Sequence, residues 1–235
     1  MNFTFGIITG GNNEGIINQM IDSIENQHIP NYEIIIVGTC YVHRANTTVI
    51  PFYEAYKPMW ITKKKNIITD NAKYENIVYL HDYIVFCDGW YEGFLQYGNN
   101  FDLCMNKIVN PDGSRFRDWH LGWGEATKLG LPHHEVYNYL LPYDEGRFSK
   151  YMYFSGSYWV AKKHVMIEFP LNEDHVWGSA EDIEWSNRVR EKYTFKMNAN
   201  SMVKLLKYKD PVFHPITEWE LECIRSNYER MMGNS

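Results

Sequence analysis

The sequence lacks the features that mark membrane, secreted and dinucleotide-binding proteins. No apolar run approaches the roughly 20 residues that a transmembrane helix needs. The chain opens directly into a predicted strand, without the charged and then apolar segments of a signal peptide. No G-x-G-x-x-G motif occurs near the first predicted strand, which argues against a dinucleotide site. We therefore expect a cytoplasmic protein with no membrane span.

Cysteine is scarce, and its spacing argues against a structural metal. The four cysteines are scattered through the chain at Cys40, Cys87, Cys104 and Cys223. No C-x-x-C pair occurs, so the usual ligand spacing of a zinc site is missing. Buried free thiols in a reducing compartment are the simplest interpretation.

The sequence also has no excess of positive charge. Lys and Arg number 23 against 29 Asp and Glu, a formal net charge of -6, which argues against a nucleic-acid partner. Aromatic residues are abundant, with 18 Tyr and 8 Trp, and exposed aromatic rings often form platforms for sugars or bases. The 235 residues are 45% hydrophobic, enough for one large α/β domain.

The first 37 residues predict a strand–helix–strand unit. Residues 3–9 and 32–37 are apolar runs typical of buried parallel strands. Between them Gly10-Gly11 makes a turn, and Asn12 or Asn13 can cap a helix. The apolar face of this helix carries Ile16, Ile17, Met20, Ile21 and Ile24. Such a unit places its two strands in parallel.

The remaining chain predicts a mostly parallel sheet flanked by helices. Strands are expected at residues 48–52, 76–80, 102–109 and 153–161, and a small C-terminal hairpin at 193–197 and 201–208. Helices are expected to start near 60 and run to about 74, and at 90–97, 162–168, from 177 and at 216–232. Residues 110–150 are irregular and rich in aromatics, Gly and His, as binding regions or lids often are. No repeat or linker divides the chain, so we expect one domain, 1–235, with one insertion, 110–150.

A polar pair ends the most buried of these strands. His81-Asp82 follows residues 76–80, and the carboxyl ends of strands in open α/β sheets are where ligands bind. Because an unpaired buried carboxylate is costly, we expect a partner for Asp82, such as a divalent cation that carries a phosphate-bearing substrate. The alternative is that Asp82 caps the next turn.

Two charged segments each allow two interpretations. Lys63-Lys64-Lys65 is either a solvated run or a source of charge for a diphosphate. Glu181, Asp182 and Glu184 lie in the first turn of a predicted helix, where they suit the macrodipole. Their mutual repulsion can also raise the pKa of one of them toward that of a general base. For Glu184 we favour a structural ion pair with Arg188 at i, i+4.

In this order, the motifs resemble nucleotide-diphospho-sugar glycosyltransferases of the GT-A fold, family 2-like and inverting. The resemblance covers nearly the whole chain except about 110–150. It rests on Phe5-Gly6-Ile7-Ile8-Thr9, on Glu33 to Gly38, on Trp60 to Asn66, on Leu80-His81-Asp82-Tyr83 in the place of the metal-binding DxD motif, on Trp177-Gly178 with Glu181-Asp182-Ile183-Glu184, and on His214.

The resemblance implies a Rossmann-like domain that transfers a sugar to a hydroxyl acceptor such as a glycan, in glycan biosynthesis. Asp182 would be the catalytic base, with Glu181 as the competing candidate. Mn²⁺ or Mg²⁺ would be held by Asp82 and His214. The donor-binding residues would be Thr9, Gly38, Lys64, Lys65, His81, Gly156 and Trp177.

Several alternatives remain open at this stage. The motif around Asp82 has one carboxylate where the family usually has two or more, which suits a non-catalytic nucleotide-sugar or glycan binding module. A nucleotidyltransferase would need a basic residue in the loop at 10–15, which has none. His214 could be a packing histidine. Asp118, His120, His133 and His134 could form a second metal site, or could be acceptor contacts or solvated loop residues.

Overall fold

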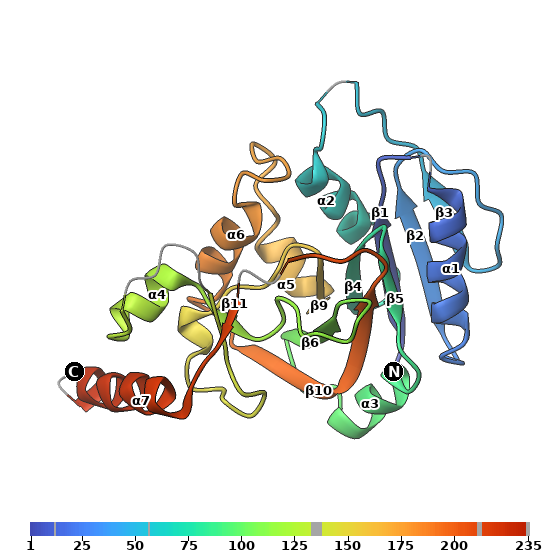
Figure 1. The fold of residues 1–235 in the computed structure, drawn as a ribbon. Coiled ribbons are helices and arrows are strands. Elements are labelled where there is room, and N and C mark those ends of the chain that lie inside the picture. Colours follow the sequence, from blue (N-terminus) through green and yellow to red (C-terminus); the bar gives the residue numbers. More distant parts are fainter. Residues whose placement is uncertain (12, 56, 133–137, 211–212, 234–235) are drawn as a thin grey trace.

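An eight-stranded sheet forms the centre of the molecule, in the order β3-β2-β1-β4-β9-β6-β10-β5 (Figure 1). The computed structural model describes residues 1–11, 13–55, 57–132, 138–210 and 213–233. The strands are β1 (Phe3–Ile8), β2 (Tyr32–Val37), β3 (Thr47–Ile50), β4 (Asn76–His81), β5 (Ile84–Phe86), β6 (Leu103–Val109), β9 (Tyr158–Lys162) and β10 (Phe195–Leu205). Neighbours are parallel except that β9 is antiparallel to β4 and β6, and β5 to β10. The expected mostly parallel α/β sheet is confirmed.

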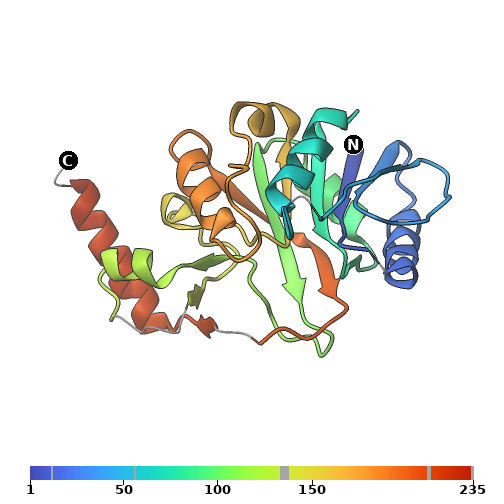
Figure 2. The same ribbon diagram turned by 90° about the horizontal axis from the view of Figure 1, so that it is seen from above.

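Helices cover both faces of this sheet. The helices α1 (Glu14–Glu25) and α3 (Trp90–Tyr97) lie on one face, and α2 (Ile61–Asn71) and α5 (Lys163–Glu168) on the other (Figure 2). Strand β1 contacts helices on both sides, because its alternate side chains point to opposite faces of the sheet. Phe3 meets Trp90 of α3 edge-on and Phe5 meets it at a tilt, with ring centroids 5.2 and 5.7 Å apart. Gly6 faces Ile68 of α2 so closely that a Cβ atom there would lie 2.3 Å from the isoleucine Cγ2.

A second, three-stranded sheet lies beside the first. It has the order β11-β8-β7 and consists of β7 (His120–Leu121), β8 (Asn138–Leu140) and β11 (Phe213–Pro215). Two helices, α4 (Trp123–Lys128) and α7 (Glu218–Gly233), flank it on the side of the molecule away from α1 (Figures 1 and 2). The described parts of the insertion, 110–132 and 138–150, thus contribute β7, α4 and β8 to a small unit that also contains β11 and α7.

The structure corrects the expected C-terminal hairpin. Residues 195–205 form one long strand, β10, which is parallel to β6 and antiparallel to β5. A register shift between Asn198 and Met202 takes up the polar stretch that suggested a turn. The Asn198 amide donates to Ser201 Oγ, so the bulge satisfies its own polar groups. The short strand β5, which sequence reasoning missed, is the antiparallel partner of β10.

The register of the central strands sets the position of the site. Ile8 at the end of β1 pairs with Val37 of β2 on one side and with His81 of β4 on the other. The segments that leave these parallel strands therefore meet at one edge of the sheet. The helix α6 (Glu181–Val189) and the loop before β9 close the opposite side of the same edge (Figure 1). The expected strand at 153–161 is shorter than predicted, because residues 153–157 form this loop.

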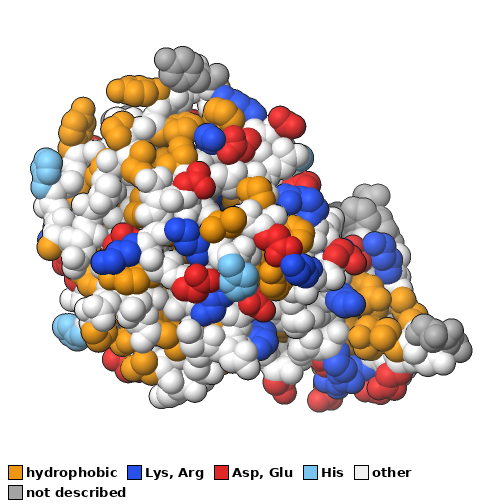
Figure 3. Space-filling model, turned by 180° about the vertical axis from the view of Figure 1, so that it is seen from behind, with side chains coloured by type: hydrophobic (Ala, Val, Ile, Leu, Met, Phe, Trp, Pro, Cys, Tyr) orange, Lys and Arg blue, Asp and Glu red, His pale blue; other side chains and the backbone are white. Residues whose placement is uncertain are grey.

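Two observations concern membrane and nucleic-acid partners. No helix of the described chain has both the length and the apolar character needed to cross a bilayer. On the back of the molecule, acidic and basic side chains are interspersed (Figure 3). That face lacks the basic stripe that a nucleic-acid partner needs.

Candidate functional site

Asp82 is already paired by neutral donors. The hydroxyl of Thr9 donates to Asp82 Oδ2 at 2.7 Å, and the amide of Asn13 donates to the same oxygen at 2.8 Å. The backbone N–H of Gly11 donates in turn to Thr9 Oγ1 at 3.1 Å. These bonds supply a partner for the Asp82 carboxylate, which is half-buried rather than buried as expected. Asn13 thus bonds to Asp82 and makes no side-chain cap on α1.

Gly38 has a steric role at this edge. Its φ is +149°, and a Cβ atom on it would lie 2.2 Å from the carbonyl oxygen of Thr9. Glycine therefore lets the ends of β2 and β1 approach each other. Gly38 lines neither of the two cavities described below.

The lysine run is buried at two of its three positions, and each buried lysine has its own protein partners. The Lys64 ammonium donates to the Thr9 carbonyl at 2.7 Å and forms an ion pair with Glu54. The Lys65 ammonium donates to the Gly156 carbonyl at 2.6 Å. Burial lowers the pKa of Lys65 to about 8, although the nearby Glu181 and Asp182 oppose the shift. Lys65 therefore bonds to the loop before β9 near the two carboxylates, and it lines neither of the two cavities described below.

His81 borders both cavities as a neutral imidazole. Burial, followed by the charge of Lys65, lowers the pKa of His81 well below its usual value. Its Nδ1 lies 3.3 Å from the Tyr83 hydroxyl. Its Nε2 is buried and has no hydrogen-bond partner among the described residues. The Gly156 backbone nevertheless hydrogen-bonds to the imidazole and partly offsets the lowering of its pKa, so the loop that accepts from Lys65 also contacts His81.

Two carboxylates begin α6 and face the main cavity. Asp182 Oδ2 accepts the N–H of Gly156 and Oδ1 accepts the N–H of Ile183, both at 2.9 Å. Burial, and then the charge of Asp182, raise the pKa of Glu181. The predicted repulsion between these carboxyls therefore contributes to the raised pKa of Glu181, and burial contributes more. Glu184 points away and pairs with Arg188 at 2.5 Å, as predicted.

Gly156 lies between the two carboxylates. A Cβ atom on it would be 3.1 Å from Glu181 Oε1 and 3.3 Å from Asp182 Oδ2. The glycine lets the loop before β9 press directly against both acids. Its N–H and C=O hold Asp182 and Lys65, so one peptide segment fixes the carboxylates and their buried counter-charge.

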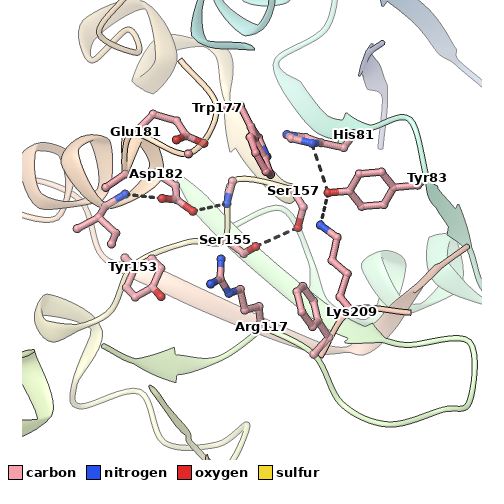
Figure 4. A pocket seen from close by; sticks show the side chains of 15 residues that line it. His81, Tyr83, Arg117, Tyr153, Ser155, Ser157, Trp177, Glu181, Asp182 and Lys209 are labelled. Carbon is pink, nitrogen blue, oxygen red and sulfur yellow. Dashed lines mark hydrogen bonds between the residues drawn. The ribbon is translucent and has the colours of Figure 1, made fainter. Parts of the chain in front are cut away.

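The main cavity has a volume of about 300 Å³ and separates charges of opposite sign (Figure 4). Glu181 and Asp182 form one side, and Tyr83 and Lys209 form the other. Arg117 also lines the cavity, from the segment after β6. The sequence analysis missed both cations, since nothing in their neighbourhoods matched a motif. The only signal was the pair Lys207 and Lys209 in the segment that follows β10.

A small cavity of about 130 Å³ adjoins the main one. Both are lined by His81 and by Trp177. Trp177 is 57% exposed. Thr9, Lys64 and Asp82 line only the small cavity. Most of the residues expected to bind the donor therefore gather around two connected cavities at the carboxyl ends of β1 and β4.

The structure separates His214 from Asp82. His214 lies in β11 of the small sheet, whereas Asp82 follows β4 of the large sheet. The His214 Nε2 is 3.3 Å from the Glu220 carboxylate, and its ring meets Tyr139 edge-on at 5.7 Å between centroids. His214 lines neither cavity that His81 borders. This corrects the expectation that Asp82 and His214 hold one cation, and a packing histidine describes His214 better.

The residues present do not fit the metal site that the resemblance implies. Among the residues that the structure describes, no three His, Cys, Asp or Glu side chains are grouped so that they could hold an ion. Mg²⁺ and Mn²⁺ prefer several oxygen ligands. Asp82 offers one carboxylate, and its Oδ2 already accepts two hydrogen bonds.

The second candidate metal site also fails to form from its described members. Asp118 accepts hydrogen bonds from the backbone of Ile108 and Trp119 and from Arg115, so it anchors its own loop. His120 packs edge-on against Tyr153, with ring centroids 4.4 Å apart. His133 and His134 lie outside the described residues.

Comparisons with solved structures identify the fold as that of GT-A glycosyltransferases. A crystal structure of GalNAc-T7 with UDP, GalNAc and Mn²⁺ has a TM-score of 0.59 at 12% identity, over 92% of this chain. S. aureus TarS, and TarS 1–349 in complex with UDP, each have a TM-score of 0.53 at 15% identity, over 97% of this chain. At such identities the likeness shows the fold alone.

This chain spans only part of those proteins. It corresponds to 45% of the GalNAc-T7 chain, 39% of the TarS chain and 66% of the TarS 1–349 chain. The sequence matches no protein-family model and no curated protein.

Proposed function

We propose that the chain is an inverting glycosyltransferase that moves a sugar from a nucleotide-diphosphate donor to a hydroxyl acceptor, such as a glycan. The observation that carries the proposal is the charge separation in the main cavity. Glu181 and Asp182 face Lys209 across a space at the carboxyl ends of the parallel strands (Figure 4). Transfer with inversion needs a base on one side of the sugar and a place for the anionic leaving group on the other. The GT-A fold supports the proposal.

Asp182 is the proposed base. It takes the proton of the acceptor hydroxyl while the oxygen attacks the anomeric carbon, and the bond to the diphosphate oxygen breaks with its electron pair on the diphosphate. Two backbone N–H groups orient the carboxylate, one on each oxygen. Orientation of this kind is what general-base catalysis requires. Glu181 remains the competing base.

The donor is proposed to bridge the two cavities. The nucleoside would occupy the small cavity beside Thr9 and Lys64, and the sugar would lie beneath Trp177 and beside Gly156. An aromatic ring that is 57% exposed can stack on a sugar or a base. Gly156 would let the sugar approach the backbone closely, next to the carboxylates.

The insertion 110–150 is proposed to form the acceptor side. A third cavity, of about 360 Å³, shares Arg117, Tyr153 and Ile183 with the main cavity. It continues between α6 and the insertion, where Asn138 and Asn187 line it. Amide side chains donate and accept hydrogen bonds, as recognition of sugar hydroxyls requires. An acceptor in this cavity would approach the donor from the carboxylate side.

A panel of nucleotide sugars tests the proposal, with donor consumption as the readout in buffers that contain either EDTA or Mn²⁺. Asp182→Asn is expected to lower the turnover of an active donor by about 10²- to 10⁴-fold, the usual effect of losing a general base. The matched control is Glu184→Gln, an isosteric change in the same helix whose carboxylate faces Arg188. It is expected to leave turnover within about threefold of wild type, since about 0.5 kcal/mol is typical of such an ion pair.

Two outcomes would contradict the proposal. Donor binding without turnover across the whole panel would support a binding module instead. Turnover that survives Asp182→Asn and Glu181→Gln alike would remove these carboxylates from the chemistry.

A further inference from the structure

Positive charge gathers at the main cavity, where Arg117 and Lys209 line the space and Lys207 lies beside the Tyr83 ring without lining it. Arg117, Lys207 and Lys209 form no ion pair with any Asp or Glu that the structure describes. Lys209 instead donates to the Tyr83 hydroxyl, and its ammonium lies 4.2 Å from the centre of the Tyr83 ring. Lys207 lies 4.0 Å from the same ring centre. Positive charge is therefore concentrated without an internal counter-ion.

The charges in this group repel one another. Burial, and then the charges of Lys207 and Arg117, lower the pKa of Lys209 to about 8. The Arg117 Nε is buried and has no hydrogen-bond partner among the described residues. Leaving a buried cationic donor unsatisfied costs about 1–3 kcal/mol or more. An anion in the cavity would remove both penalties, because it would accept from Arg117 and offset the repulsion at Lys209.

The position of Lys209 is fixed by its backbone. Asn110 accepts the N–H of Lys209 at 3.0 Å and donates to its carbonyl at 3.1 Å. Leu206 donates its N–H to the Tyr83 carbonyl at 2.8 Å, which ties the segment to the loop after β4. The ammonium is therefore held beside Tyr83 at the carboxyl end of β4. A fixed cation of this kind stabilises an anion better than a mobile surface lysine does.

We propose that Arg117 and Lys209 bind the donor diphosphate directly and stabilise it as it leaves, in the place of a divalent cation. The inference rests on the proposed function and names how that site recognises its donor. The diphosphate would lie near His81, which lines both the small and the main cavity.

The proposed transfer needs no metal ion to account for its charges. When the glycosidic bond breaks, its electron pair and one negative charge pass to the terminal oxygen of the nucleoside diphosphate. The Arg117 guanidinium and the Lys209 ammonium stabilise that charge through charge-assisted hydrogen bonds. The proton of the acceptor passes to the carboxylate on the other side of the cavity, so the two events stay separated in space.

Titration of UDP and of inorganic diphosphate into the full chain tests the inference, in EDTA and again in Mn²⁺. Both probes are expected to bind in EDTA, with affinities within about threefold of those in Mn²⁺. Lys209→Met and Arg117→Met are each expected to weaken binding about 10- to 100-fold, the usual effect of losing a charge-assisted hydrogen bond. Lys209→Arg keeps the charge and is expected to retain most of the affinity.

The matched control is Lys207→Met. It removes an equal charge two residues from Lys209, at a side chain that does not line the cavity. It is expected to change affinity less than about threefold, which separates direct contact from the general field. Circular dichroism and thermal melting of each variant confirm that it is folded, and Lys209→Arg provides a result if Lys209→Met does not fold.

One set of results would overturn the cation site, and another would overturn the proposed function. Binding that disappears in EDTA, or that is unchanged by Lys209→Met and Arg117→Met, would overturn the cation site while leaving glycosyl transfer possible. Diphosphate binding that depends on both cations, without turnover of any donor, would keep the cation site and contradict the enzyme.

Discussion

At the scale of single residues, the sequence identified most of the polar side chains at the site but not their partners. Thr9, His81, Gly156 and Asp182 all lie at the expected edge of the sheet. The hydroxyl and the amide that pair with Asp82 come from 73 and 69 residues away. Partners so distant in sequence leave no local pattern.

The lysine run also shows that sequence spacing does not identify the partners of a side chain. Spacing places Lys64 and Lys65 at the start of a helix, but it does not say which way each ammonium points. In the structure both are buried, and their partners, Glu54 and the carbonyls of Thr9 and Gly156, are groups that no motif connects with them. Lys209 and Arg117, which do line the main cavity, come from segments without a recognisable pattern.

The raised pKa of Glu181 predicts a pH-dependent change in stability. Burial and the Asp182 charge make the folded protein hold the Glu181 proton more tightly than the unfolded chain does. The wild type therefore loses this contribution to stability as the pH rises through the unfolded value of about 4.3 and toward neutrality. We expect Glu181→Gln to be more stable than wild type at pH 7 and equal to it below about pH 4.

Urea denaturation at both pH values measures this difference. Glu184→Gln is the control, because this carboxylate lies in the same helix and is paired with Arg188. A Glu181→Gln variant that is less stable than wild type at pH 7, but equal to it at low pH, would show that ionised Glu181 is favourably paired in the folded state.

At the scale of elements, hydrophobic periodicity predicted the strands and helices that are buried on a regular pattern. The observed β2 and α3 have the predicted bounds. The buried face of α1 contains the expected Ile17, Met20, Ile21 and Ile24, whereas Ile16 is 37% exposed. Elements that depend on tertiary contacts were missed: β5 has three residues, and β10 crosses its polar bulge because β6 and β5 hold it on both sides.

The contact between β1 and α2 predicts a sharp cost for a small side chain. Gly6→Ala would place a Cβ atom 2.3 Å from Ile68 Cγ2, so either the helix or the strand must shift. We expect a loss of about 1–3 kcal/mol in the free energy of unfolding, as for other overpacked cores. Because α2 carries Lys64 and Lys65, the same contact also sets their positions.

A double-mutant cycle with Ile68→Ala, followed by urea denaturation, measures this coupling. The double variant is expected to be more stable than the sum of the two single changes predicts, because the Ile68 side chain no longer blocks the new methyl group. Gly15→Ala is the control, since a Cβ atom there meets nothing within 4 Å and lies in a helix. Strict additivity of Gly6→Ala and Ile68→Ala would contradict the steric explanation.

At the scale of the whole molecule, the fold class followed from the sequence because one strand–helix–strand unit and several buried strands leave few alternatives. The arrangement of the small sheet did not follow, since it joins residues 120–121 and 138–140 to residues 213–215 near the other end of the described chain. That pairing carries His214 away from the large sheet. Lys209 lines the cavity and is the member of this segment that does so among its described residues.

Net charge was also a poor guide to the site. A chain with a formal charge of -6 holds two cations at the edge of a cavity that faces two carboxylates. Local fields of this kind, in a partly closed space, decide what binds there more than the overall charge does. The charge separation is a property of the folded molecule, because Arg117, the pair Glu181 and Asp182, and Lys209 come from three segments that are widely spaced in the sequence.

The most direct test of the account is a crystal structure of the chain with UDP, grown in the presence of Mn²⁺. The account predicts a nucleoside in the small cavity beside Thr9, with the diphosphate near His81 and its oxygens within hydrogen-bond distance of Arg117 and Lys209. A diphosphate held by Mn²⁺ on Asp82, with both cations turned away from it, would contradict the account, as would a nucleotide bound outside these two cavities.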